Sequence, residues 1–175
     1  MHNPLAHTGA SYRPAIQNGV ANVIGDGTRP IRTDGKVSTA DLHLLNGSGL
    51  ALVPHFLQAA PDAIKGTQAS MVSTRDKSLT NGLADSGGYQ ASTGVLNLTE
   101  RRQNDMLRFS EGLDGATILD GPTSSIANPK SKLSSFSDCL EFTEVNTLYA
   151  IQNRIPGRTK LLNVSQGRSQ KEAED

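Results

Sequence analysis

From residue 50 onward, short apolar runs alternate with longer stretches of helical pattern, and this alternation constrains the fold more than any other feature of the chain. Such an alternation is typical of βα units that build a parallel sheet. The expected strands are Leu50–Pro54, Gly82–Ala84, Ala116–Leu119 and Lys160–Val164. The expected helices cover residues 56–64, 97 or 99 to 113, and 136–154. We therefore predict an α/β fold with about four βα units.

The last of these helices has a clear periodicity. Cys139, Phe142, Val145 and Tyr149 recur at spacings of three and four residues, which places them on one side of a helix. Cys139 is expected to be a buried small hydrophobic residue rather than a reactive one.

The first 49 residues differ in composition from the rest. They are rich in Gly, Asn, Thr, Asp and Pro, and their apolar pieces are short. This pattern predicts loops with one hairpin. We therefore expect a loop-rich segment over residues 1–49, an α/β domain over residues 50–168 and a charged tail over residues 169–175.

Composition excludes several classes of protein. No window approaches the roughly 20 apolar residues of a membrane-spanning helix, and the start lacks the pattern of a signal peptide, so a cytoplasmic location without membrane contact is expected. One cysteine allows no internal disulfide, and four scattered histidines predict no metal site. Seventeen basic and seventeen acidic residues give no overall positive field, although a local basic patch remains open.

Polar residues follow three of the expected strands. Asp85, Asp120 and Gln166 come at the strand ends and are 35 and 46 residues apart, about one βα unit each time. In a parallel barrel, side chains at the carboxyl ends of the strands converge on one pocket. Two carboxylates and an amide would suit a planar heterocycle, because carboxylates accept from ring N–H and amino groups and an amide donates to a ring carbonyl.

The Asp-Ser-Gly-Gly sequence that starts at Asp85 has more than one interpretation. Chymotrypsin-like serine proteases carry the same four residues around their nucleophile, but here the flanking residues are Ala84 and Tyr89 instead of Gly and Pro. That fold is all-β and usually rich in disulfides, and although His55 could be nominated as its base, nothing around His55 resembles the expected motif. Asp85 could also simply begin a turn before two glycines.

A longer pattern favours a different family. The hexapeptide Asp85–Gln90 resembles the Asp-Ser-Gly-Gly-(Phe/Tyr)-Gln motif of the tRNA-guanine transglycosylase (queuine tRNA-ribosyltransferase) superfamily at all six positions. The downstream order is similar too, with Ile-Leu-Asp120-Gly-Pro-Thr and then Asn-Val-Ser-Gln166-Gly167. The resemblance covers roughly residues 80–168.

The resemblance implies a role for each residue of the first motif. Asp85 would be the general acid/base beside the glycosidic bond, and Ser86 would line the pocket. Gly87 and Gly88 would let the base approach the backbone, and Tyr89 would stack on its face.

The remaining positions of the resemblance are implied to bind the same base. Gln90 completes the motif as a substrate-binding residue. Asp120 would read the amino and N–H edge of guanine or a 7-deazaguanine, and Gln166 and the backbone at Gly167 would read the exocyclic carbonyl.

The implied reaction replaces guanine in a nucleic acid, DNA or tRNA, by a 7-deazaguanine such as preQ0 or preQ1. A carboxylate displaces guanine from C1′, and the new base attacks the covalent intermediate, which requires a flipped-out nucleotide. The tRNA enzymes have Gln-Gly-Gly where this chain has Gln166-Gly167-Arg168. They also have an Asp-Glu-Cys-Thr-Pro-like stretch where this chain has Asp120-Gly-Pro-Thr. These departures are closer to the phage and bacterial branch that modifies DNA.

A complete (β/α)8 TIM barrel has about 250 residues, so this chain is expected to form an incomplete barrel. In the family, the nucleophilic aspartate and the structural zinc site lie beyond the Gln-Gly segment, so no cofactor is expected in this chain. We expect a second chain to supply the missing half and the isolated chain to be inactive. The alternative is a non-catalytic remnant that binds nucleic acid or another subunit.

Overall fold

The chain divides into two compact units, Met1–Leu83 and Ala84–Asp175. The computed structural model describes residues 12–31, 37–47, 51–65 and 69–164. The expected boundary between residues 49 and 50 falls inside the first unit. The expected domain end at residue 168 and the charged tail lie outside the described residues.

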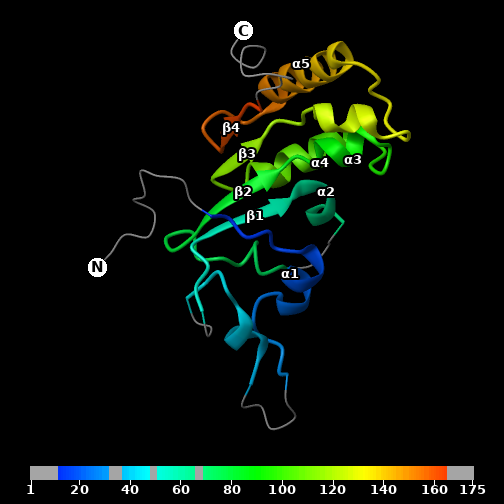
Figure 1. Cartoon of the computed structure of the whole chain (residues 1–175). Coiled ribbons are helices and arrows are strands. Elements are labelled where there is room, and N and C mark those ends of the chain that lie inside the picture. The colour runs from blue at the N-terminus through cyan, green and yellow to red at the C-terminus, as the bar shows by residue number, and fades with distance from the viewer. Residues whose placement is uncertain (1–11, 32–36, 48–50, 66–68, 165–175) are drawn as a thin grey trace. The chain divides into compact units, whose positions relative to one another are not determined.

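Four strands form a parallel sheet in the order β1-β2-β3-β4, which confirms the predicted mixed α/β class (Figure 1). The strands are β1 (His55–Ala59), β2 (Asn81–Asp85), β3 (Gly115–Thr117) and β4 (Lys160–Leu162). Strands β3 and β4 pair in parallel with Ala116 opposite Leu161. Each strand follows its predecessor in the chain as its neighbour in the sheet, which is the order that successive βα units produce.

The first strand lies later in the chain than predicted. The apolar run at residues 50–54 was expected to be the strand and residues 56–64 a helix, but β1 occupies His55–Ala59. Within β1, Phe56 and Gln58 are buried and alternate with less buried residues, which is the period of a strand. Pro61 occupies the first turn of α2 (Ala60–Ala63), where its missing N–H costs nothing.

Two further short helices lie in the described part of the first unit, before β1. Residues 20–24, expected in a loop or hairpin, belong to α1 (Asn18–Ile24), and η1 (Thr39–Leu42) follows after an antiparallel bridge between Pro30 and Ser38. His43 is fully buried next to η1. Its Nδ1 accepts from the backbone N–H of Leu45 at 3.3 Å, so Nε2 carries the proton that it donates to Thr74 Oγ1 at 3.0 Å.

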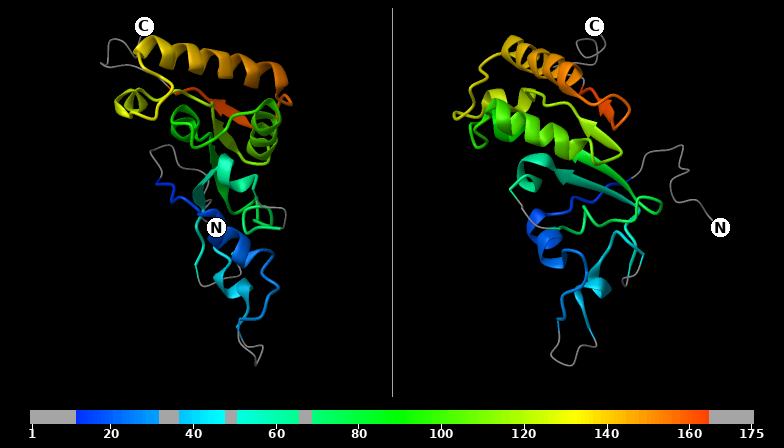
Figure 2. Two further views of the ribbon diagram at one scale, coloured as in Figure 1. Left: turned by 90° about the vertical axis from the view of Figure 1, so that its right-hand side faces the viewer. Right: turned by 180° about the vertical axis from the view of Figure 1, so that it is seen from behind.

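The second unit contains most of the helical residues. Its helices are α3 (Gly88–Ser92), α4 (Glu100–Ser110), η2 (Thr123–Ala127) and α5 (Phe136–Asn153). Helices α4 and α5 lie side by side (Figure 2) and are joined by a hydrogen bond from Gln103 Nε2 to Asn146 Oδ1 at 2.6 Å. Both helices were predicted, and their starts match the capping residues, Thr99 for α4 and Ser135 for α5.

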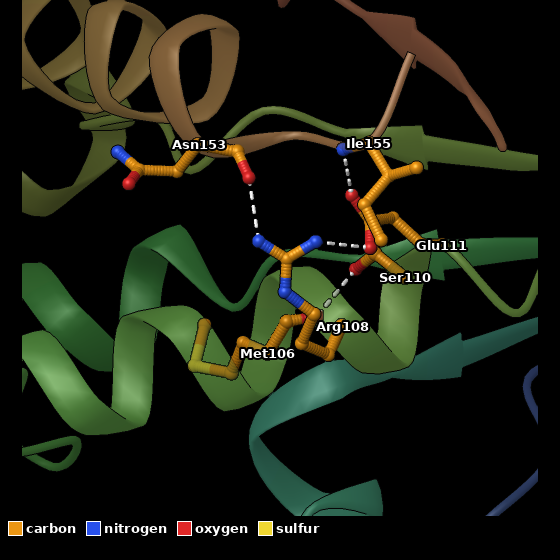
Figure 3. A network of polar contacts seen from close by, with 6 residues as sticks. All are labelled: Met106, Arg108, Ser110, Glu111, Asn153 and Ile155. Atoms are coloured by element: carbon orange, nitrogen blue, oxygen red, sulfur yellow. Dashed lines mark hydrogen bonds and ion pairs between the residues drawn. The ribbon is translucent and has the colours of Figure 1, made fainter. Parts of the chain in front are cut away.

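A polar network also joins the carboxyl ends of α4 and α5 (Figure 3). Arg108 donates to the carboxylate of Glu111 at 2.5 Å and to the backbone carbonyl of Asn153 at 2.5 Å. The same buried carboxylate accepts from the backbone N–H of Ile155 at 2.6 Å. Arg108 therefore satisfies a backbone carbonyl that α5 leaves free at its end, and Glu111 binds both Arg108 and the chain just beyond the helix.

Strand β3 is shorter than predicted, and this changes the place of Asp120. The strand ends at Thr117, so Asp120 follows it after two buried residues, Ile118 and Leu119, and does not itself end the strand. The pairing nevertheless continues, because the N–H of Ile118 donates to the carbonyl of Leu162 at 3.0 Å. Asp120 thus stands in the loop that leaves the sheet edge.

Among the described residues, none of the helices has the length and apolar character needed to cross a membrane.

Candidate functional site

The turn after β2 is built by the residues of the Asp-Ser-Gly-Gly motif. Asp85 Oδ1 accepts from the N–H of Gly87 at 3.1 Å, and Gly87 has a φ of 73°, a left-handed conformation that favours glycine. The N–H of Ser86 donates to Thr117 Oγ1 at 3.0 Å, which fastens this turn to β3. The chain then enters α3 at Gly88.

Gly88 and Asp120 are in close contact. A Cβ atom on Gly88 would lie 2.1 Å from the carbonyl oxygen of Asp120 and 2.6 Å from its Oδ1. No side chain other than hydrogen fits there. The structure therefore brings the Asp-Ser-Gly-Gly turn and Asp120, 32 residues beyond Gly88, to one place.

The loop that carries Asp120 is fixed from its other side by α5. The N–H of Gly121 donates to Thr143 Oγ1 at 2.9 Å, and Thr143 in turn donates to the carbonyl of Cys139 at 2.8 Å. A Cβ atom on Gly121 would lie 3.1 Å from that same carbonyl oxygen. Asp120 is thus held between two glycines that each pack against backbone.

Ser86 places a hydroxyl in the interior of this turn. The residue is 6 % exposed, and its Oγ has no hydrogen-bond partner among the described residues. An unpaired buried hydroxyl costs on the order of 1–3 kcal/mol. A bound ligand or a water molecule that paired with this hydroxyl would remove that cost.

Tyr89 and Gln90 extend from the turn along α3. The Tyr89 side chain is 47 % exposed, and its hydroxyl accepts from Asn128 Nδ2 at 2.9 Å. Gln90 is half-buried, and its carbonyl accepts from the N–H of Leu96 at 2.8 Å. Gln166 and Gly167, the remaining predicted site residues, lie outside the described residues.

Three residues that support this site have no signal in the sequence. Thr117, Thr143 and Asn128 hold the Ser86 turn, the Gly121 loop and the Tyr89 ring, respectively. The partners are 22 to 39 residues apart in the chain, so no local motif connects them.

Burial and hydrogen bonds set the charge states near α5. Burial raises the pKa of the Cys139 thiol, as does the neighbouring charge of Asp138, so the thiol stays protonated at neutral pH. Hydrogen bonds from Ser134 and Ser135 lower the pKa of Asp138 to about 2. Within the described ranges, no group of three His, Cys, Asp or Glu side chains could hold a metal ion.

A cleft of about 480 Å³ lies between α4 and α5, apart from the Asp85–Asp120 turn. The residues that line it include Gln103, Phe142, Val145, Asn146 and Tyr149, and none of the predicted site residues. The residues predicted to share one side of α5 do not share one environment. Cys139 is buried, whereas Val145, which lines the cleft, is 59 % exposed. The cleft does not add to the candidate site.

Comparison of the chain with protein-family models, with curated proteins and with solved structures finds no match.

Proposed function

We propose that the second unit binds guanine or a 7-deazaguanine where the turn that begins at Asp85 meets the loop of Asp120. It would form the base-recognition and acid/base part of a transglycosylase. The reaction would exchange guanine in DNA or tRNA for a 7-deazaguanine. In this proposal the four-stranded parallel sheet belongs to a TIM-type (β/α)8 barrel.

The contact between Gly88 and Asp120 carries the proposal. The sequence assigned the Asp-Ser-Gly-Gly turn and Asp120 to the same base, each from a separate motif. In the structure they meet at a point where a Cβ on Gly88 would overlap the Asp120 backbone. Strands β2 and β3 are neighbours in the sheet, so the segments that follow them lie side by side, and the glycine at position 88 lets them come into contact. The unpaired hydroxyl of Ser86 in the same turn supplies a further polar group for a ligand.

The Asp120 carboxylate would accept hydrogen bonds from the N1–H and the 2-amino group of the base. Asp85 would move the proton. When the C1′–N9 bond of guanine breaks, its electron pair stays on the base, which takes a proton from Asp85. The incoming 7-deazaguanine returns a proton to Asp85 as its N9 bonds to C1′. The intervening carboxylate nucleophile is assigned to no residue of this chain.

The proposal is tested by calorimetric titration of guanine, 7-cyano-7-deazaguanine and adenine into the purified chain. We expect the first two to bind and adenine not to, because adenine lacks the N1–H and 2-amino donors. Asp120→Asn should weaken binding about 10- to 150-fold, the value of a hydrogen bond to a charged group.

Asp105→Asn provides the matched control, since it makes the same change at an exposed position on α4. It should bind like the wild type. Equal binding of adenine and guanine, or equal loss in both variants, would refute the assignment of Asp120.

A further inference from the structure

Tyr89 presents an aromatic ring whose position is fixed. The ring is about half exposed, and the Nδ2 group of Asn128 holds its hydroxyl at 2.9 Å. An exposed tyrosine is usually free to change rotamer, but one anchored at its hydroxyl offers a stable flat surface. Stacking on such a surface suits any nucleobase, since every base has a π-face.

The turn that begins at Asn128 is fastened to the same helix. The N–H of Lys130 donates to Asn128 Oδ1 at 2.9 Å, and the N–H of Lys132 donates to the carbonyl of Ser92 at 2.9 Å. Ser92 and Tyr89 both belong to α3. The turn therefore holds the backbones of Lys130 and Lys132 near α3, the helix that carries Tyr89, at two fixed points.

Both lysine side chains are exposed, and neither forms an ion pair within the part of the chain that the structure describes. The segment from Asn128 to Ser135 carries no acidic residue. Asp138, the next acid along the chain, accepts hydrogen bonds from Ser134 and Ser135. The chain as a whole is neutral, so this turn is a local positive feature on a neutral background.

The surface formed by Tyr89, Asn128, Lys130 and Lys132, here the tyrosine–lysine surface, continues directly from the candidate site. Tyr89 follows Gly88 in the chain, and η2 leads from the Asp120 loop to Asn128. Both segments that meet at the Gly88–Asp120 contact thus run on into this surface.

We propose that the tyrosine–lysine surface binds a single-stranded nucleic acid next to the target nucleotide. A base that adjoins the target nucleotide stacks on Tyr89, in place of the stacking on the exchanged base that the family resemblance implies, and Lys130 and Lys132 contact the neighbouring phosphates. This inference rests on the proposed function for its place beside the base site, but its test does not depend on base exchange.

The test measures fluorescence anisotropy of a labelled 12-nucleotide single strand with a central guanine, as DNA and as RNA, at several salt concentrations. The slope of log K against log salt should fall by about 0.7 per lysine removed, and hence by about 1.4 in Lys130→Ala/Lys132→Ala. Tyr89→Ala should weaken binding roughly 5- to 150-fold, whereas Tyr89→Phe, which keeps the ring, should retain most of the affinity.

The double variant Lys65→Ala/Lys77→Ala makes the same charge change at exposed lysines of the first unit and should leave the slope unchanged. Circular dichroism and thermal unfolding confirm that each variant is folded. The proposal is overturned if the folded chain fails to bind either strand at low salt, or if both double variants change the slope equally. Equal competition by polyglutamate would also overturn it, because a peptide offers no base to stack.

Asp120→Asn separates this inference from the proposed function. If both hold, Asp120→Asn loses the free base but keeps the strand. If the wild-type chain binds the single strand but not the free base, the proposed function is refuted and the proposal for the tyrosine–lysine surface is retained.

Discussion

The α-carbon of Gly88 lies against the backbone of Asp120, so that a Cβ at this position would lie 2.1 Å from the Asp120 carbonyl oxygen. Real Cβ atoms do not approach a carbonyl oxygen so closely. The turn after β2 and the loop after β3 can meet only because residue 88 is a glycine. The geometry of the candidate site therefore depends on this one contact.

Gly88→Ala should destabilise the protein by about 1–3 kcal/mol or more, since the obstacle is backbone that cannot rotate away. Denaturant unfolding followed by circular dichroism measures the change. Gly19→Ala is the matched control, because Gly19 lies in α1 with nothing within 4 Å of the new Cβ. There the substitution should be neutral or stabilise by up to about 1 kcal/mol.

Arg108→Met should destabilise the second unit more than Glu111→Gln. The Glu111 side chain is 5 % exposed, so loss of Arg108 leaves a buried carboxylate without its charged partner, at a cost of about 3–5 kcal/mol. Glu111→Gln leaves Arg108, which is 37 % exposed and can turn to water, and should cost about 1–3 kcal/mol. Unfolding free energies of the two variants decide the order, and the reverse order would contradict the network in Figure 3.

Ser135→Ala should cost about 1 kcal/mol, because Ser135 caps α5 by accepting from the N–H of Asp138 at 3.1 Å. Ser137→Ala, an exposed position in the first turn of the same helix, should change stability little. Thermal unfolding of the pair isolates the cap. Similar melting temperatures for the two variants would argue against it.

His43 should make the first unit sensitive to mild acid. Burial lowers the pKa of His43 below its ordinary value of 6.5, because the charged form would lose its contact with water. The unfolded state therefore binds the proton more readily, so stability is present above about pH 6.5 and is lost as the pH falls toward the folded pKa. Unfolding free energies between pH 8 and pH 5 should show this decline, and His43→Gln should lack its share of it.

Local patterns predicted the elements that local interactions determine. Helices α4 and α5 begin at their capping residues, Thr99 and Ser135, and strand β2 ends at Asp85 as expected. The first strand was misplaced because residues 50–54 are more apolar than β1, whose buried positions include the polar Gln58. A polar residue inside a strand gives no periodic apolar signal, so the sequence favoured the wrong run.

Within the candidate site, the Asp-Ser-Gly-Gly turn could be predicted from its residues. The sequence also predicted that the ends of the strands converge, but not the specific contact between this turn and Asp120. The supporting hydrogen bonds could not be predicted. Ser86 meets Thr117 and Tyr89 meets Asn128 across 31 and 39 residues, and such pairs arise from packing rather than from spacing.

The most direct test of the account is a ¹H–¹⁵N correlation spectrum of the labelled chain, recorded during titration with 7-aminomethyl-7-deazaguanine. We predict that the largest shifts occur at the amides of Gly87, Gly88, Tyr89 and Gly121 and vanish in Asp120→Asn. Shifts confined to the cleft between α4 and α5, or an unchanged spectrum of the folded chain, would contradict a base site at the Gly88–Asp120 contact.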